Sequence, residues 1–111
     1  MNELHGPESR INKTTALTEK LDQVNGVGDR PNVHDILTGS RPDGTAFEGV
    51  GLTCGNWTSS GEGRAQVGHH DRRGQGPGVD SWNSSHATRG CSQLDFRSTG
   101  GAGLFYCFAI D

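Results

Sequence analysis

The chain has 111 residues, of which only 30% are hydrophobic and 18 are glycine, and its formal net charge is −3. This length favours a single domain, 1–111, and arginines scattered through an acidic chain exclude an electrostatic nucleic-acid surface. The sequence also contains no apolar stretch long enough to span a bilayer, and its first residues carry neither the basic nor the apolar region of a signal peptide.

Residues 1–45 form a lead-in that contains no aromatic residue and few apolar ones. The pattern predicts a short helix over Thr15–Leu21, followed by turns at Asn25-Gly26 and Arg30-Pro31. Residues 46–111 contain all three cysteines, both tryptophans and all four phenylalanines. We therefore predict that the core of the domain lies in this second segment.

Short strands are predicted in residues 46–111, each bounded by turn residues. They cover Gly51–Cys54 with Asn56–Thr58, Ala65–Gly68, and the apolar run Leu104–Ile110. The glycine-rich stretch Gly74–Gly78 is predicted to be a loop. The expected architecture is a loop-rich domain with a thin core, which needs cross-links to offset the entropy that its glycines lose on folding.

The three cysteines are not in Cys-x-x-Cys spacing, which argues against a zinc ribbon or a redox pair. Structural disulfides are the better interpretation, and they indicate an oxidising compartment. A bridge between Cys54 and Cys91 would close a loop that the chain-entropy model values at roughly 4 kcal/mol. Cys107 lies in the terminal apolar run, and the residues alone leave its partner open.

Five motifs in order resemble the C-terminal half of bacterial secreted lectin-like proteins, which are similar in layout to the endostatin branch of the C-type lectin-like fold. These motifs are Thr53–Thr58, Val67–Arg72, Ser81–His86, Gly90–Gln93 and Gly103–Ala109. With residues 32–45, which also resemble that group, the likeness extends from about Ile11 to the end of the chain. It implies an α+β, C-type lectin-like fold with short antiparallel strands, and a secreted or periplasmic location.

The resemblance also implies a disulfide pattern. Four cysteines of this fold pair first with fourth and second with third, and Cys54 and Cys91 match the second and third. Cys107 matches the fourth, whose partner belongs to an N-terminal part of the domain with no counterpart in this sequence. Cys107 is therefore expected to be unpaired or intermolecular. The C-terminal strand is expected to pair within residues 1–50, to pair with a second copy as a homo-oligomer, or to stay an exposed edge.

Carbohydrate binding is the function that the resemblance implies. Sugar recognition needs an aromatic face and planar polar groups, which Trp82, Asn83 and His86 offer in one turn-rich segment. The alternative for Trp82 is a place in the core, because a thin core needs its large apolar side chains. Calcium-dependent C-type lectins have Trp-Asn-Asp at the position of Trp82–Ser84. Since a hydroxyl replaces that carboxylate here, the case for a calcium ligand set is weak.

Transition-metal binding is a further interpretation, resting on His69, His70 and His86 together with Asp71. Neighbouring strand residues point to opposite faces, so at most one of His69 and His70 joins a given site. The alternative is a polar network that satisfies Asp71. The doublet His34-Asp35 also occurs in metal-dependent phosphohydrolases, but those are long helical bundles that this glycine-rich chain cannot form, and no metal role is assigned to it.

The resulting functional hypothesis is a noncatalytic extracellular binding module, lectin-like, that binds glycans through the loops around Trp82 and through His69, His70, Asp71 and His86. No nucleophile elbow, phosphate-binding loop or zincin motif supports an enzyme. The alternative is a structural or protein-protein interaction module that has lost sugar binding, with cell-surface proteins as partners.

Overall fold

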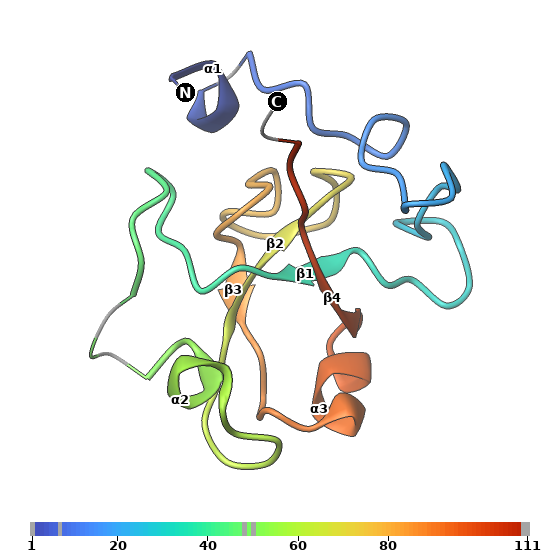
Figure 1. Ribbon diagram of the computed structural model, residues 1–111. Helices are drawn as coiled ribbons and strands as arrows, with labels where there is room; N and C mark the ends of the chain where they lie inside the picture. Colours follow the sequence, from blue (N-terminus) through green and yellow to red (C-terminus); the bar gives the residue numbers. More distant parts are fainter. Residues whose placement is uncertain (1, 7, 48, 50, 110–111) are drawn as a thin grey trace.

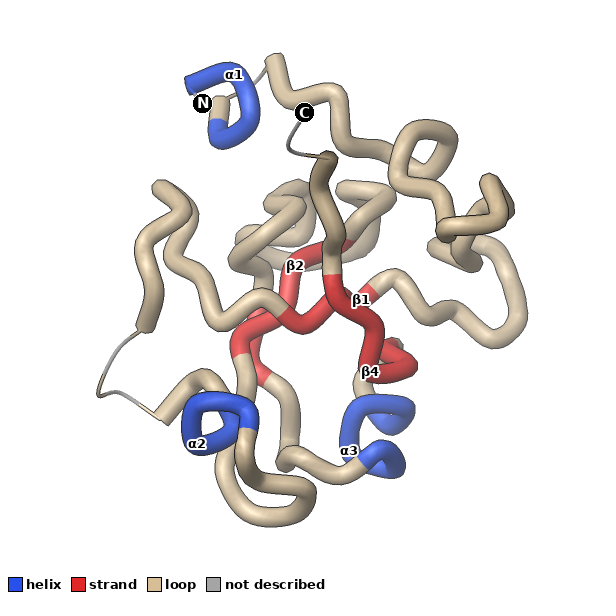
Figure 2. The backbone as a smooth tube through the Cα atoms, viewed as in Figure 1, coloured by secondary structure: helices blue, strands red, loops and turns tan. Residues whose placement is uncertain are grey.

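The computed structural model describes residues 2–6, 8–47, 49 and 51–109, and shows a small α+β protein built on one mixed sheet (Figure 1). The described elements, in chain order, are α1 (Asn2–His5), β1 (Asp35–Leu37), α2 (Cys54–Trp57), β2 (Gln66–His69), β3 (His86–Ala87), α3 (Gln93–Ser98) and β4 (Gly101–Phe105). Long loops connect these short elements, as Figure 2 shows, so the prediction of a loop-rich α+β domain is confirmed.

The sheet has the strand order β3-β2-β1-β4. β1 pairs antiparallel with β2, and β2 with β3, whereas β4 runs parallel to β1. The expectation of antiparallel strands alone was therefore wrong for β4. α3 begins at a capping box formed by Ser92 and Asp95, and it returns the chain to the sheet so that Gly101 pairs with Asp35.

The terminal apolar run finds its partner inside the first fifty residues, because β4 pairs with β1. β4 covers Gly101–Phe105 and ends before most of the predicted strand Leu104–Ile110. Beyond it, the Tyr106 hydroxyl donates a hydrogen bond to the Trp82 carbonyl at 2.9 Å. Of the three outcomes considered for this segment, pairing with residues 1–50 is the one that the structure shows.

Two predicted elements have a different structure. Residues 15–21 form turns and a bridge between Leu17 and Gln23 instead of a helix. Leu21 has a φ of 65°, which a helix does not allow, and seven residues are too few for a helix to form without tertiary packing. The stretch around α2 was predicted as a strand, but Gly55 and Asn56 take left-handed conformations there, and Thr58 and Ser59 donate to the Cys54 carbonyl.

The core is small and is cross-linked by the predicted disulfide between Cys54 and Cys91. The bridge packs with Leu37, Ala65 and Val67 in one cluster. Leu37 lies within residues 1–45, so the lead-in supplies a core strand as well as loops. Cys107 is free and exposed among the described residues.

β2 passes very close to the segment that carries Trp82. A Cβ placed on Gly68 would lie 1.8 Å from the Trp82 carbonyl oxygen, so only glycine fits at this position. This close approach brings the strand that carries His69 against the segment that leads to His86.

Candidate metal centre

The register of the sheet places three polar side chains at one end of its core face. Asp35 pairs with His69 across β1 and β2, and His86 pairs with Val67 across β2 and β3. Directly opposed residues share a face of the sheet, and so do residues two apart on a strand. Asp35, His69 and His86 therefore continue the face on which Leu37 and Val67 form the core.

Four side chains converge at this end of the sheet. The Nε2 atoms of His69 and His34 lie 3.0 and 3.5 Å from Oδ1 of Asp35. Nε2 of His86 lies 3.3 Å from Oδ2 of the same carboxylate. The rings of His34 and His69 are stacked, with centroids 3.8 Å apart. Three imidazole nitrogens thus face both oxygens of one buried carboxylate.

The other ring nitrogen of each histidine is held by an acceptor. Nδ1 of His34 lies 2.9 Å from Oδ1 of Asp71. Nδ1 of His69 lies 2.9 Å from the Val79 carbonyl, and Nδ1 of His86 lies 3.1 Å from the Ala87 carbonyl. Because carbonyl and carboxylate oxygens only accept, Nδ1 donates in each case. In the neutral ring Nε2 is then the bare nitrogen, which is the arrangement that metal-ligating histidines adopt.

The carboxylate of Asp35 is buried without a satisfactory hydrogen-bond partner in the described part of the chain. Its side chain is 2% exposed, and among the described residues neither of its oxygens, nor Nε2 of His69, has a hydrogen-bond partner with good geometry. A buried, unsatisfied polar group costs about 1–3 kcal/mol, and more when it is charged. Burial alone would raise the pKa of Asp35, but the adjacent imidazoles of His69 and His86 outweigh it and hold that pKa below its ordinary value. The carboxylate therefore stays charged, and a protonated His86 or a bound cation can supply its counter-charge.

The distances fit a metal ion. Donor atoms of His34, Asp35 and His69 all lie within 4.8 Å of one another, and all three residues are buried. Two ligands that bind Zn²⁺ at about 2.0 Å in tetrahedral geometry lie about 3.3 Å apart. The three separations from the Asp35 oxygens, 3.0 to 3.5 Å, bracket that value. Imidazole and carboxylate are also the donors that zinc and related transition metals accept.

Asp71 supports the site from behind His34. It accepts from the His34 ring and from the backbone N–H groups of Val27 and Arg73, at 2.9, 2.7 and 3.1 Å. Burial alone would raise the pKa of Asp71, but these hydrogen bonds hold it below its ordinary value. For His34, burial and the neighbouring His69 lower the pKa, which favours the neutral ring that can bind a metal.

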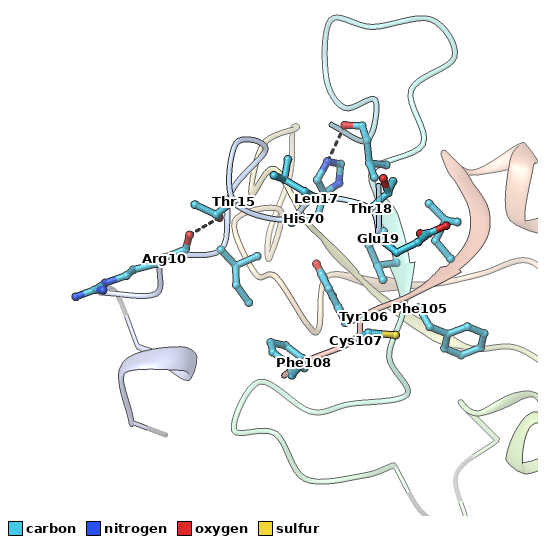
Figure 3. Close-up of a pocket in the computed structure, with 15 residues that line it drawn as sticks. Arg10, Thr15, Leu17, Thr18, Glu19, His70, Phe105, Tyr106, Cys107 and Phe108 are labelled. Atoms are coloured by element: carbon cyan, nitrogen blue, oxygen red, sulfur yellow. Dashed lines mark hydrogen bonds between the residues drawn. The ribbon is translucent and has the colours of Figure 1, made fainter. Parts of the chain in front are cut away.

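His70 follows the last residue of β2, in a turn, and its side chain points away from the cluster. Its Nε2 lies 2.9 Å from the Val24 carbonyl. Figure 3 shows His70 on the wall of a separate apolar cavity of about 380 Å³, together with Tyr106 and Cys107. His70 therefore does not belong to the cluster around Asp35.

Trp82 and Asn83 are buried, and their side chains contact other parts of the protein. Trp82 is 9% exposed and is packed by Tyr106 and Phe108 at edge-on angles. Asn83 is 2% exposed, and its amide donates to the Ser40 hydroxyl at 3.0 Å and to the Arg41 carbonyl at 3.0 Å. Both residues are thus largely buried, although they line part of a cavity of about 270 Å³.

The structure thus divides the residues singled out from sequence. His69 and His86 join the cluster, Asp71 supports it, and His70, Trp82 and Asn83 lie elsewhere. Sequence reasoning missed His34 and Asp35, because the doublet was judged only against the helical fold in which it is familiar. A signal was present in the sequence, since Asp35 directly precedes the apolar pair Ile36-Leu37. In the structure all three residues are buried in β1.

No helix among the described residues has the length and apolar character that crossing a membrane requires. No protein-family model, no curated protein and no solved structure matches the chain.

Proposed function

We propose that this protein is a noncatalytic binding module, C-type lectin-like in fold and extracellular, whose loops are organised by one divalent transition-metal ion of the zinc class. The observation that carries the metal assignment is the convergence of the Nε2 atoms of His34 and His69 on the unsatisfied, buried carboxylate of Asp35. The lectin-like fold and the extracellular location are supported by the resemblance of the sequence motifs, and by the Cys54–Cys91 disulfide, which suits an oxidising compartment.

The ion would serve as a second cross-link. The disulfide packs against Ala65 and Val67 at the beginning of β2, and the cluster lies at the end of that strand, at His69. Its four residues come from β1 and the residue before it, from β2 and from β3. A core of this size gains stability from such cross-links, because they offset the entropy of ordering long loops.

Binding rather than catalysis is supported by how the histidines are used. In His34 and His69, Nδ1 is engaged by an oxygen acceptor and Nε2 faces the proposed ion, so neither ring has a nitrogen left to act as a general base. Glycans remain the ligand class that the resemblance suggests. Since Trp82 and Asn83 are buried, glycan recognition would have to use the surface around His86, and a glycan array read with and without metal tests this.

Calorimetric titration of the metal-stripped chain with Zn²⁺ tests the metal assignment. We expect one equivalent to bind. An Asp35→Asn variant, which keeps the shape of the side chain but removes its charge, is expected to weaken binding by more than about 100-fold, since even outer-shell partners are worth 10–100-fold. His70→Gln is the matched control, because it alters a buried histidine outside the cluster. Equal Zn²⁺ binding by Asp35→Asn and the parent chain would refute the assignment.

Stability should respond to pH in opposite directions with and without metal. The adjacent Asp35 carboxylate raises the pKa of His86 above its ordinary value of 6.5. In the metal-free protein this pair stabilises the fold fully below pH 6.5, and its contribution is lost as pH rises through the raised pKa. In the metal-loaded protein, the loss of imidazole protons favours metal binding, so stability rises over the same interval. Urea melts between pH 6 and 8 with and without Zn²⁺ measure both trends, and parallel trends would contradict the prediction.

A protein-interaction role is the second candidate. Phe105 and Phe108 are 56% and 54% exposed, and they flank the free, exposed thiol of Cys107. If this surface pairs two copies, the chain should run as a disulfide-linked dimer on a non-reducing gel, and Cys107→Ser should run as a monomer. A parent chain that stays monomeric under oxidising conditions would exclude pairing through Cys107.

A further inference from the structure

We propose that the metal ion is held by His34, Asp35 and His69 alone and keeps one coordination position open, which takes a small monoanionic carboxylate from the adjacent cavity. This inference rests on the proposed metal centre and names the ligand that the centre would accept.

The first argument is the arrangement of the donors. His34, Asp35 and His69 form a tight group in which every donor atom lies within 4.8 Å of the others. His86 lies outside this group and approaches only the second oxygen of Asp35, and its side chain is 39% exposed. Two histidines and one carboxylate are a ligand set that leaves positions open for an exogenous ligand, whereas closed structural zinc sites use four protein ligands.

The second argument is the cavity beside this group. The rings of His34, His69 and His86 form part of the wall of a cavity of about 360 Å³, which lies within the size range of small-molecule sites. The loop around Gly74–Pro77 and the side chain of Asn32 form other parts of the wall. A ligand entering from this side would meet the imidazoles that hold the ion.

The third argument is charge. A divalent ion with Asp35 as its only anionic ligand keeps one net positive charge. None of the residues on the cavity wall is an acid, a lysine or an arginine. The charge of Asp71 faces the other way, toward the N–H groups of His34, Val27 and Arg73. One monoanion would therefore neutralise the centre, and attraction in a partly enclosed site is stronger than in water.

Asn32 supplies a hydrogen-bond donor for the second carboxylate oxygen. Its Oδ1 accepts from the His34 backbone N–H at 3.1 Å. The NH₂ group of the same amide is then left as a donor on the cavity wall, beside the residues that hold the ion. A carboxylate bound to the ion through one oxygen could receive this N–H with the other.

Absorption spectra of the Co²⁺-loaded full chain test the inference, because Co²⁺ uses the same ligand types as Zn²⁺ and its visible bands report coordination. Titration with acetate should change the spectrum in a saturable way, and titration with acetamide, its uncharged analogue, should not. His86→Ala should keep Co²⁺ affinity within about tenfold of the parent and keep the acetate response, since a residue outside the ligand set acts at most as an outer-shell partner.

Asn32→Asp sharpens the test. It keeps the acceptor for the His34 N–H but removes the donor and adds a negative charge to the wall. Acetate affinity should fall at least about tenfold, as expected for losing one hydrogen bond to a charged group, while Co²⁺ binding persists. Absence of Co²⁺ binding by the parent would refute the metal centre itself. Co²⁺ binding without an acetate response, or a response only in His86→Ala, would show that His86 closes the site and would overturn this inference alone.

Discussion

Replacing both bridged cysteines, in a Cys54→Ala/Cys91→Ala double variant, is expected to lower the free energy of unfolding by about 4 kcal/mol. The bridge spans 37 positions of sequence, and closing a loop of that length removes this much conformational entropy from the unfolded chain. Both cysteines are also part of the small core cluster, so their truncation removes packing as well. Domains of this size are typically stable by only about 5–15 kcal/mol, so the loss is a large fraction of the total.

Urea denaturation at fixed metal concentration measures this change. Cys107→Ser is the matched control, because it removes an exposed thiol outside the core and should alter stability by no more than about 0.5 kcal/mol. A double variant that unfolds within about 1 kcal/mol of the parent would show that the bridge is not the main cross-link of the fold.

Zn²⁺ is expected to stabilise the protein strongly through the cluster around Asp35. At a free concentration about one hundred times its Kd, an ion that binds only the folded state adds about 2.7 kcal/mol to the free energy of unfolding. Stability should rise further with each tenfold increase in Zn²⁺, by about 1.4 kcal/mol, as mass action requires. Adding a chelator should reverse the effect completely.

Thermal melts at several Zn²⁺ concentrations test this linkage. In His69→Ala, which removes a buried ligand, the melting temperature should no longer depend on Zn²⁺. In His70→Gln the dependence should persist, even if the melt begins from a lower temperature, because His70 lies outside the cluster and contacts the Val24 carbonyl. A Zn²⁺ dependence that survives in His69→Ala would place the ion elsewhere in the chain.

The parts of the fold that could be predicted are those specified by local pattern or by a pairwise chemical need. The stretch Ala65–Gly68 was predicted as a short strand because turn residues bound it, and β2 (Gln66–His69) forms there. The expectation that at most one of His69 and His70 joins a given site agrees with their positions, although His70 lies in the turn after β2 and not on the strand. The disulfide was also predicted, although through resemblance rather than from spacing.

The remainder depends on contacts between distant segments. Residues 15–21 have helix-forming composition, yet tertiary context and a left-handed Leu21 give turns instead. The cluster around Asp35 unites residues more than thirty positions apart through the register that pairs Asp35 with His69. No local pattern encodes that register. The role of His34 and Asp35 therefore depends on the position of β1 between β2 and β4.

The alternation along β2 also bears on how this protein would avoid misfolding. A shift of β2 by one residue would turn His69 away from Asp35 and bring His70 and Gly68 to the core face. Such a shift would cost only a modest amount of hydrophobic free energy, because the protein has so few buried aliphatic residues. The ion, however, could not be held at all, because its ligands would lie on opposite sides of the sheet. Metal binding would then stabilise only those chains whose central strands have paired in the correct register.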